Sequence, residues 1–171
     1  EEFDVLPGEE SRRILDHENT GKPIFLSISE LHKNKGLDVA LQGIALLPQE
    51  IRENIRYCIA GGGEEKESLE KLIIKLGLEG QVLLLGFVDN AKKLLGGADI
   101  FLFPSRTENL PFAILEAGLQ SLPVISTSVG GIPEIIKDME SGILVHKENP
   151  NEIAEAIKYM LLHPERAITF G

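Results

Sequence analysis

The sequence predicts an α/β fold, a doubly wound, six-stranded, parallel Rossmann-like sheet, from two observations. Six short apolar runs recur between residues 24 and 145, and they are rich in Ile, Val, Leu and Phe without a clean two-residue alternation. Such runs are typical of strands that are buried on both faces. Between the runs, apolar residues change to the helical spacing of i, i+3, i+4 and i+7. Alternating strands and helices imply right-handed crossovers and a parallel sheet that helices cover on both sides.

Each strand is expected where an apolar run is bounded by turn residues. The six ranges are 24–29, 55–60, 82–85, 98–103, 123–127 and 142–145. Helices are expected over the periodic segments 37–45, 69–76 and 153–161. Gly77 follows the second of these segments, where a glycine commonly ends a helix, and Pro111 and Pro133 each suit a first helical turn.

The chain is expected to form one Rossmann-like domain over residues 23–165, which is within the usual size range. Residues 1–22 are polar and contain five glutamates, which favours a linker or edge segment. Residues 166–171 carry no closing signal and are interpreted as the truncated tail of a longer polypeptide.

Charge and cysteine usage narrow the function classes. The formal net charge of −10 disfavours nucleic acid as a partner, because a negative field repels phosphate backbones. Local basic groups and helix N-termini still allow a small phosphorylated ligand. No apolar run approaches the roughly 20 residues of a membrane helix, and the first residues lack the pattern of a secretory signal. The single cysteine, Cys58, makes no internal disulfide, so a cytoplasmic location is expected.

Ligands of doubly wound sheets lie beyond the carboxyl ends of the strands, near a switch in strand order. The loop over 104–111 is the most informative of the expected loops there. Glu108 lies in this loop, before a helix that is expected to begin near Pro111, and Glu116 lies within that helix. The free amides of the first helical turn, near residues 109–113, could receive an anionic or hydroxyl-rich ligand. On spacing alone, the two glutamates could equally be a partner of the helix dipole and a solvated helix residue.

Two runs change that weighting, SRTENLPFAILEA (105–117) and PVISTSVGGIPE (123–134). Together they resemble the glycogen-synthase-like group of retaining glycosyltransferases, glycosyltransferase family four. Enzymes of that group have the GT-B architecture, in which two Rossmann-like domains face a cleft. The resemblance covers residues 24–165 and implies that the chain is the C-terminal, donor-binding domain.

The resemblance implies roles at the matching positions. Glu116 resembles the glutamate that binds the ribose hydroxyls of a nucleotide, and Glu108 the catalytic-site glutamate beside the donor sugar. The motif usually has glycine after the first glutamate, where this chain has Asn109, a residue that tolerates unusual backbone angles. The implied backbone contacts to the donor come from Asn109, Leu110, Phe112, Gly86, Val88, Gly130 and Gly131. For the pair Gly130–Gly131, a tight turn is an equally good explanation.

The run SISELHKNKG (27–36) matches the segment in which such enzymes place an arginine and a lysine on the donor diphosphate. Lys35 agrees with the pattern and is expected to stabilise the leaving group, whereas Glu30 replaces the arginine and reverses its charge. His32, Lys33 or Arg106 could offset that carboxylate. The alternative for Lys35 is a solvated lysine at the start of a helix, and for His32 a loop or surface histidine is the favoured interpretation.

The implied reaction transfers a hexose-type group from a nucleotide diphosphate sugar to a hydroxyl acceptor, with retention. No metal and no cofactor are expected, and the acceptor site and any membrane contact would lie in a missing N-terminal domain. The isolated chain is expected to bind nucleotide and to transfer little. The rival hypotheses are a non-catalytic module that binds nucleotide sugar or protein, and half of a nucleotide-sugar epimerase. A nicotinamide-dependent dehydrogenase is disfavoured because the glycines at 61–63 lack the dinucleotide-binding spacing.

Overall fold

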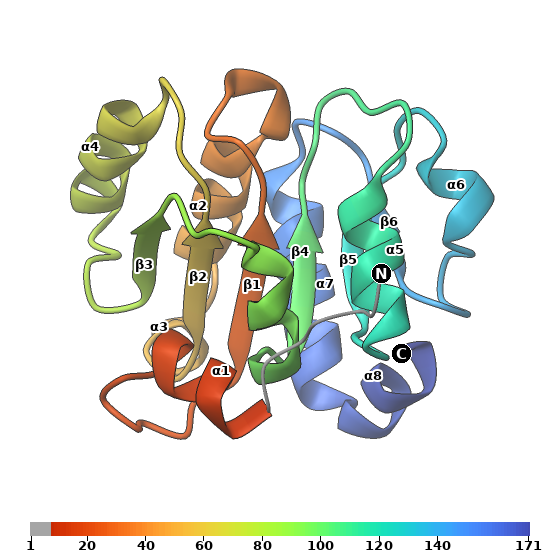
Figure 1. Ribbon diagram of the computed structural model, residues 1–171, viewed down its shortest axis with the longest axis horizontal. Coiled ribbons are helices and arrows are strands. Elements are labelled where there is room, and N and C mark those ends of the chain that lie inside the picture. Colours follow the sequence, from red (N-terminus) through yellow and green to blue (C-terminus); the bar gives the residue numbers. More distant parts are fainter. Residues whose placement is uncertain (1–7) are drawn as a thin grey trace.

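The computed structural model describes residues 8–171, and its centre is a six-stranded sheet with the order β3-β2-β1-β4-β5-β6 (Figure 1). All neighbouring strands pair in parallel. This confirms the predicted fold class, and every predicted strand lies within two residues of an observed one. The strands are β1 (Ile24–Ile28), β2 (Arg56–Ala60), β3 (Val82–Gly86), β4 (Ile100–Phe103), β5 (Val124–Thr127) and β6 (Ile143–Val145).

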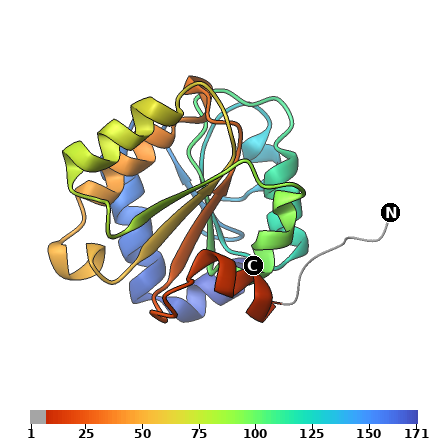
Figure 2. The same cartoon turned by 60° about the vertical axis from the view of Figure 1, so that its left-hand side comes forward.

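Helices cover both faces of the sheet, as Figure 2 shows. One face carries α2 (Leu37–Ala45), α4 (Lys66–Leu76) and α7 (Pro150–Leu162). The other carries the 3₁₀ helix η2 (Ala91–Gly97) and α5 (Phe112–Leu119). The remaining helices are α1 (Gly8–Leu15), the 3₁₀ helix η1 (Lys33–Lys35), α3 (Gln49–Arg52), α6 (Ile132–Ile135) and α8 (Pro164–Phe170).

The helix ends follow from local chemistry. Gly77 ends α4 in a left-handed conformation with φ 65°, as its position in the sequence predicts. The side chain of Asn149 caps α7 by accepting a hydrogen bond from the Glu152 amide at 3.2 Å. No helix within residues 8–171 has the length and the apolar composition needed to span a bilayer.

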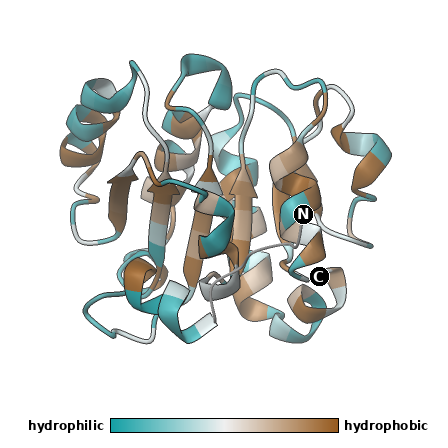
Figure 3. Cartoon of the chain, viewed as in Figure 1, coloured by the Kyte–Doolittle hydropathy of each residue, from teal (hydrophilic) through white to brown (hydrophobic). Residues whose placement is uncertain are grey.

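The sheet separates two apolar cores. The first lies under α2, α4 and α7 and includes Phe25, Leu41 and Ile157. The second lies under η2 and α5 and includes Phe101 and Ile114. The strands contribute to both cores, which is why Figure 3 shows them as a brown centre inside more hydrophilic helices.

The N-terminal segment is expected to be a linker or edge segment, and part of it is helical. Residues 8–22 contain helix α1, and Leu15 at its end is completely buried. Arg12 on α1 donates to both oxygens of Asp99 at 3.0 Å. The helix is held by the burial of Leu15 and by the Arg12–Asp99 ion pair, so few apolar residues in its sequence could reveal it. The rest of that expectation, for residues 1–7, lies outside the described residues.

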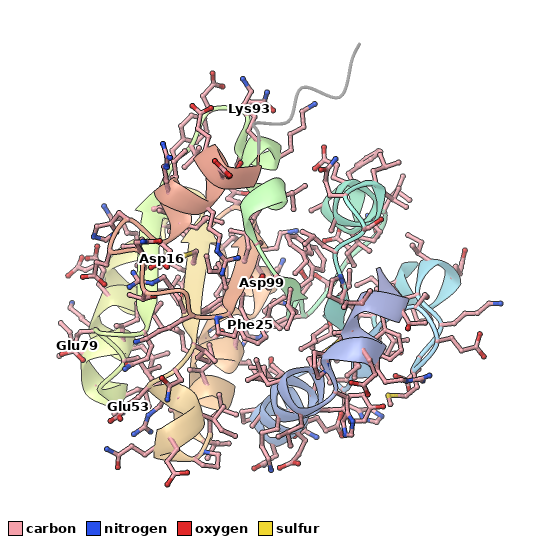
Figure 4. All side chains as sticks on the ribbon, turned by 90° about the horizontal axis from the view of Figure 1, so that it is seen from below. Asp16, Phe25, Glu53, Glu79, Lys93 and Asp99 are labelled. Atoms are coloured by element: carbon pink, nitrogen blue, oxygen red, sulfur yellow. The ribbon has the colours of Figure 1, made fainter. Side chains whose placement is uncertain are left out.

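A second set of polar contacts, around Asp16, lies at the amino end of the sheet. Figure 4 shows this end from below, with Asp16 and Asp99 labelled. Asp16 accepts hydrogen bonds from the Thr20 hydroxyl at 2.9 Å and the Gly21 amide at 3.0 Å, and it lies 3.5 Å from Arg56 Nε. At the other end of the chain, residues 166–171 lie mostly in α8, and Phe170 is buried. Both segments therefore pack against the domain.

Candidate functional site

The candidate site lies where the strand order switches. The chain runs outward from β1 to β2 and β3 on one side, and from β4 to β5 and β6 on the other, so the switch falls between β1 and β4. The loops after these two strands meet at the carboxyl edge of the sheet, at the top of Figure 1. Ligands of doubly wound folds bind at this place.

The two charged residues predicted for catalysis form an ion pair at the switch. Lys35 Nζ, from η1 in the loop after β1, donates to Glu108 Oε2, from the loop after β4, at 3.0 Å. Their side chains are 26% and 14% exposed, so the pair is partly sheltered from water. The Lys35 ammonium also lies 5.7 Å from the centre of the Phe103 ring.

Backbone packing brings these loops together. Gly36 follows η1 in a left-handed conformation, and any Cβ at this position would overlap the carbonyl oxygen of Pro104. The Arg106 amide donates to the carbonyl oxygen of Asn34 at 2.7 Å. The chain therefore needs glycine at Gly36 for steric reasons, and the loop after β1 rests directly on the loop after β4.

The amides expected to receive a ligand are partly engaged. The Asn109 amide donates to Oε1 of Glu108 at 3.2 Å, and the Phe112 amide donates to the carbonyl of Leu110 at 3.0 Å. Asn109 does not adopt a positive φ, so the loop does not use its tolerance of unusual backbone angles. The second oxygen of Glu108 is thus held by its own loop.

The glycine pair after β5 supports this loop from the other side. Gly130 has φ 53°, and a Cβ there would overlap the carbonyl oxygen of Glu108. A Cβ on Gly131 would lie 2.8 Å from the carbonyl oxygen of Asn109. The pair therefore makes close backbone contact with the loop that carries Glu108, in addition to forming a turn.

Arg106 is saturated by partners within the protein. Its Nη1 and Nη2 donate to the two oxygens of Asp38 at 2.7 and 2.8 Å. Nε donates to Glu148, Nη2 reaches the same carboxylate at 3.1 Å, and Nη1 donates to the carbonyl of Lys33 at 2.5 Å. These bonds use all five guanidinium hydrogens, so Arg106 has no free donor for a ligand in this arrangement.

The ion-pair cluster of Arg106, Asp38 and Glu148 shifts the pKa values of Arg106 and Asp38. Hydrogen bonds from Arg106 to Asp38 and Glu148 raise the pKa of Arg106 above its ordinary value. Burial alone would raise the pKa of Asp38, but the hydrogen bonds and the charge of Arg106 outweigh burial and bring it below its ordinary value. Both shifts favour the charged forms of the cluster.

Two of the residues predicted for nucleotide contacts, Glu116 and Val88, lie on the α5 face. Glu116 is half-buried on α5, between Ile114 and Ala117, which pack into the second core. Its carboxylate makes no hydrogen bond or ion pair within residues 8–171. Gly86 ends β3, and Val88 is partly buried against the second core just before η2, which packs on α5. The structure therefore places Val88 on the same face of the sheet as Glu116.

The remaining predicted residues are placed in the loop after β1 and beside it. His32 Nδ1 accepts from the Asn34 amide at 3.1 Å, and His32 Nε2 lies 3.6 Å from Glu64. Glu30 is exposed and makes no ion pair with any residue from 8 to 171. Since Arg106 and His32 both have carboxylate partners of their own, neither pairs with Glu30.

The glycine-rich segment after β2 is packed rather than free. The Leu31 amide donates to the carbonyl of Gly62 at 2.9 Å, and side chains at Gly61 or Gly63 would overlap the carbonyls of Ser29 and Leu31. The glycines thus support the loop that carries Lys35 and Glu30.

A groove of about 600 Å³ borders Glu108, and Lys35 is not among its lining residues. It is lined by the loops after β4, β5 and β6, with Arg106, Gly130, His146 and Lys147 among the lining residues.

Two partners of Arg106 in the site, Asp38 and Glu148, are not predicted from the sequence. They lie 68 and 42 positions from Arg106, and no motif links carboxylates at such distances.

Comparison with known proteins fits this geometry. A family model described as glycosyl transferases group 1 matches residues 9–171. An uncharacterized glycosyltransferase from Methanocaldococcus jannaschii is 36% identical over 166 residues, which cover 94% of this chain and 42% of that protein. The alpha-D-kanosaminyltransferase of Streptomyces kanamyceticus is 30% identical over 161 residues, which cover 91% of this chain and 42% of that protein. The chain thus spans about two fifths of the length of these curated relatives.

Solved structures share the fold. The Anabaena protein Alr3699/HepE in complex with UDP has a TM-score of 0.84 at 21% identity, over 97% of this chain and 48% of that one. Its complex with UDP-glucose has a TM-score of 0.84 at 22% identity with the same coverage. WaaG, a glycosyltransferase involved in lipopolysaccharide biosynthesis, has a TM-score of 0.82 at 23% identity, over 97% of this chain and 48% of that one. With a Rossmann-like fold matching GT-B glycosyltransferases and a family match over nearly all of its length, the chain belongs to the glycosyl transferases group 1 family.

Proposed function

We propose that this chain is the donor-binding domain of a retaining glycosyltransferase that transfers a hexose-type group from a nucleotide diphosphate sugar to a hydroxyl acceptor. The observation that carries the proposal is the Lys35–Glu108 pair at the switch between β1 and β4. A cation for the diphosphate and a carboxylate for the sugar lie side by side there. The UDP and UDP-glucose complexes of a protein with the same fold support a nucleotide sugar as the ligand.

In the proposed mechanism, the diphosphate of the donor takes the place of Glu108 as the partner of Lys35. The ammonium then stabilises the negative charge that develops on the leaving diphosphate, which is electrostatic catalysis. Glu108 turns to the hydroxyls of the sugar and orients the anomeric carbon toward the acceptor. The acceptor hydroxyl attacks the anomeric carbon from the same face that the diphosphate leaves. The bond between that carbon and the diphosphate oxygen breaks, and the hydroxyl proton passes to the departing diphosphate.

The nucleoside is proposed to lie over the α5 face. Glu116 accepts hydrogen bonds from the ribose hydroxyls, since its carboxylate is half-buried and has no partner among the described residues. The backbone at Gly86 and Val88 borders the base. The acceptor site lies in the part of the protein that this chain does not include, so the chain alone is proposed to bind nucleotide and to transfer little.

Calorimetry with UDP, GDP and ADP, and with their sugars, tests this proposal. We expect at least one nucleotide to bind the chain, and Glu116→Ala to weaken that binding about tenfold or more, since a charged hydrogen-bond acceptor is lost. Glu70→Ala is the matched control, because Glu70 is an exposed helix glutamate on α4, on the opposite face of the sheet. Equal affinities of the Glu116→Ala variant and the unmodified chain would remove the ribose role.

One observation favours a second candidate, a non-catalytic module that binds a nucleotide sugar. Glu30 lies in the loop where a diphosphate would bind, and its charge is not offset by an ion pair within the described residues. A protein in which this domain is joined to an acceptor-binding domain separates the two candidates. Glycosyl transfer with a panel of donors supports the enzyme, and binding without transfer supports the module.

A further inference from the structure

We propose that Arg106 is a positioning residue that sets the spacing between Lys35 and Glu108, through Asp38 and Glu148 and without contacting the donor. The inference rests on the proposed function, because that spacing matters only if Lys35 and Glu108 hold one ligand between them.

Arg106 is close in sequence to one member of the pair and bonded to the neighbours of the other. It lies two positions before Glu108 in the loop after β4. Its guanidinium donates to the carbonyl of Lys33 at 2.5 Å, and its amide donates to the carbonyl of Asn34 at 2.7 Å. Both acceptors lie within two positions of Lys35. One residue therefore joins the two loops by side chain and backbone at once.

The carboxylates that hold Arg106 come from two further elements. Asp38 lies in the first turn of α2, and Glu148 lies in the loop between β6 and α7. The Arg106 side chain is only 17% exposed, and the contact with Asp38 is bidentate, so the guanidinium plane has little freedom. The cluster thus connects the loops after β1, β4 and β6 through a planar group of fixed shape.

A direct role on the donor is disfavoured by the same contacts. All five donors are used, so a diphosphate could bind Arg106 only by displacing Asp38 or Glu148. Those two carboxylates also give the cluster a net charge of −1, which repels a diphosphate. Lysine could not replace the arginine, because its single ammonium cannot reproduce two bidentate contacts.

The first experiment measures the spacing without any ligand. Backbone amide chemical shifts of the chain are compared between the unmodified protein and Arg106→Lys. We expect the amides of both Lys35 and Glu108 to shift, although neither residue is changed. Arg52→Lys is the matched control, because Arg52 donates to the Ala45 carbonyl at 3.0 Å from α3, at the opposite end of the sheet (Figure 1). A shift confined to Glu108 and its sequence neighbours would overturn the proposal.

The second experiment measures the consequence for binding. Arg106→Lys is combined with Lys35→Ala, and UDP affinity is measured for the four members of the cycle. In the chain that keeps Lys35, we expect Arg106→Lys to weaken UDP binding about tenfold. In the Lys35→Ala background, we expect the same substitution to weaken UDP binding less than about twofold. The free-energy losses of two residues are not additive when one acts through the other. Equal losses in both backgrounds would mean that Arg106 contacts the nucleotide itself, and no loss would mean that the spacing does not matter. Both results overturn the proposal.

Glu148→Gln provides a second test of the role of Arg106 if the Arg106→Lys variant does not fold. Glu148 is 54% exposed, so the fold tolerates the change, yet one arm of the cluster is weakened. We expect the same two amides to shift in the same directions by a smaller amount, and unchanged Lys35 and Glu108 amides would overturn the proposal. If the unmodified chain binds no nucleotide, the proposed function fails, whereas the amide shifts still decide whether Arg106 sets the spacing.

Discussion

Lys35 and Glu108 are 73 positions apart in the chain, and their charged groups lie 3.0 Å apart at the boundary between β1 and β4. Under the proposed function, an ion pair at this place has two effects on an arriving diphosphate. Glu108 keeps the ammonium in the site, and it also competes with the phosphate for that ammonium. Removing the charge of Glu108 should therefore change the affinity for a diphosphate.

Glu108→Gln is expected to strengthen UDP binding about three- to tenfold, because it removes a competing and repelling charge next to Lys35. Isothermal titration calorimetry with UDP checks this. Glu155→Gln is the matched control, since Glu155 pairs with Lys158 on α7, far from the switch. Weaker UDP binding by Glu108→Gln would mean that Glu108 helps to hold the nucleotide rather than competing for Lys35.

Glu30→Arg is expected to raise the affinity for UDP about tenfold, because an exposed negative charge in the loop after β1 becomes a positive one. The gain should shrink as salt is added, since exposed charges are screened over about 10 Å at 0.1 M salt. Titrations at two salt concentrations measure both effects. Glu50→Arg makes the same charge change on α3, and an equal gain there would show only a general effect of net charge.

Gly130→Ala is expected to destabilise the chain by more than about 2 kcal/mol, because a Cβ combines a left-handed φ with overlap on the Glu108 carbonyl. Urea unfolding gives the free energy of unfolding. Gly77→Ala separates the two causes, because Gly77 has φ 65° but no atom within 4 Å of the place that a Cβ would occupy. It should cost only about 1–2 kcal/mol. Similar losses at the two sites would argue against close packing of Gly130 on the Glu108 loop.

Ser121→Gly is expected to stabilise the chain by about 0.5–1 kcal/mol, because Ser121 follows α5 with φ 55°, a conformation that favours glycine. Thermal unfolding checks the direction. Ser68→Gly within α4 should have the opposite sign, since glycine weakens a helix interior.

Acid should remove the contribution of Asp38. Its pKa is lowered in the folded chain, so its stabilisation is fully present above the unfolded value of about 3.9 and is lost as the pH falls through the folded value. The difference in unfolding free energy between the unmodified chain and Asp38→Asn should therefore be constant from pH 7 to about pH 5 and shrink below about pH 4. Denaturant unfolding across this range measures it. A difference that persists at the lowest pH would show that the carboxylate charge is not the cause.

The strands could be predicted because each is an apolar run that needs cover on both faces, and such runs are visible in the sequence itself. Helix α1 could not, since Leu15 is its one completely buried apolar side chain and Arg12 is fixed by Asp99, which lies 87 positions away. Glu108 and Lys35 could be predicted as members of one site. Their direct contact depends on Gly36 resting on Pro104, which is a tertiary relationship without a local signal.

The partners of Arg106 could not be predicted from the sequence either. An arginine in a polar loop near the switch could equally bind a ligand or the protein, and sequence spacing does not distinguish the two. Asp38 and Glu148 occupy the donors of Arg106 because the fold brings α2 and the loop after β6 next to it. Long-range ion pairs of this kind depend on the completed fold.

The saturation of Arg106 has a consequence for how this loop can diverge among relatives. One inserted or deleted residue between Pro104 and Arg106 would carry the guanidinium out of register with three anchors at once. Side chains beyond it, such as the exposed Asn109 and Leu110, have no such anchors. We therefore expect relatives that keep this arginine to differ in the amino acids at the tip of the loop and to agree in the number of residues at its base.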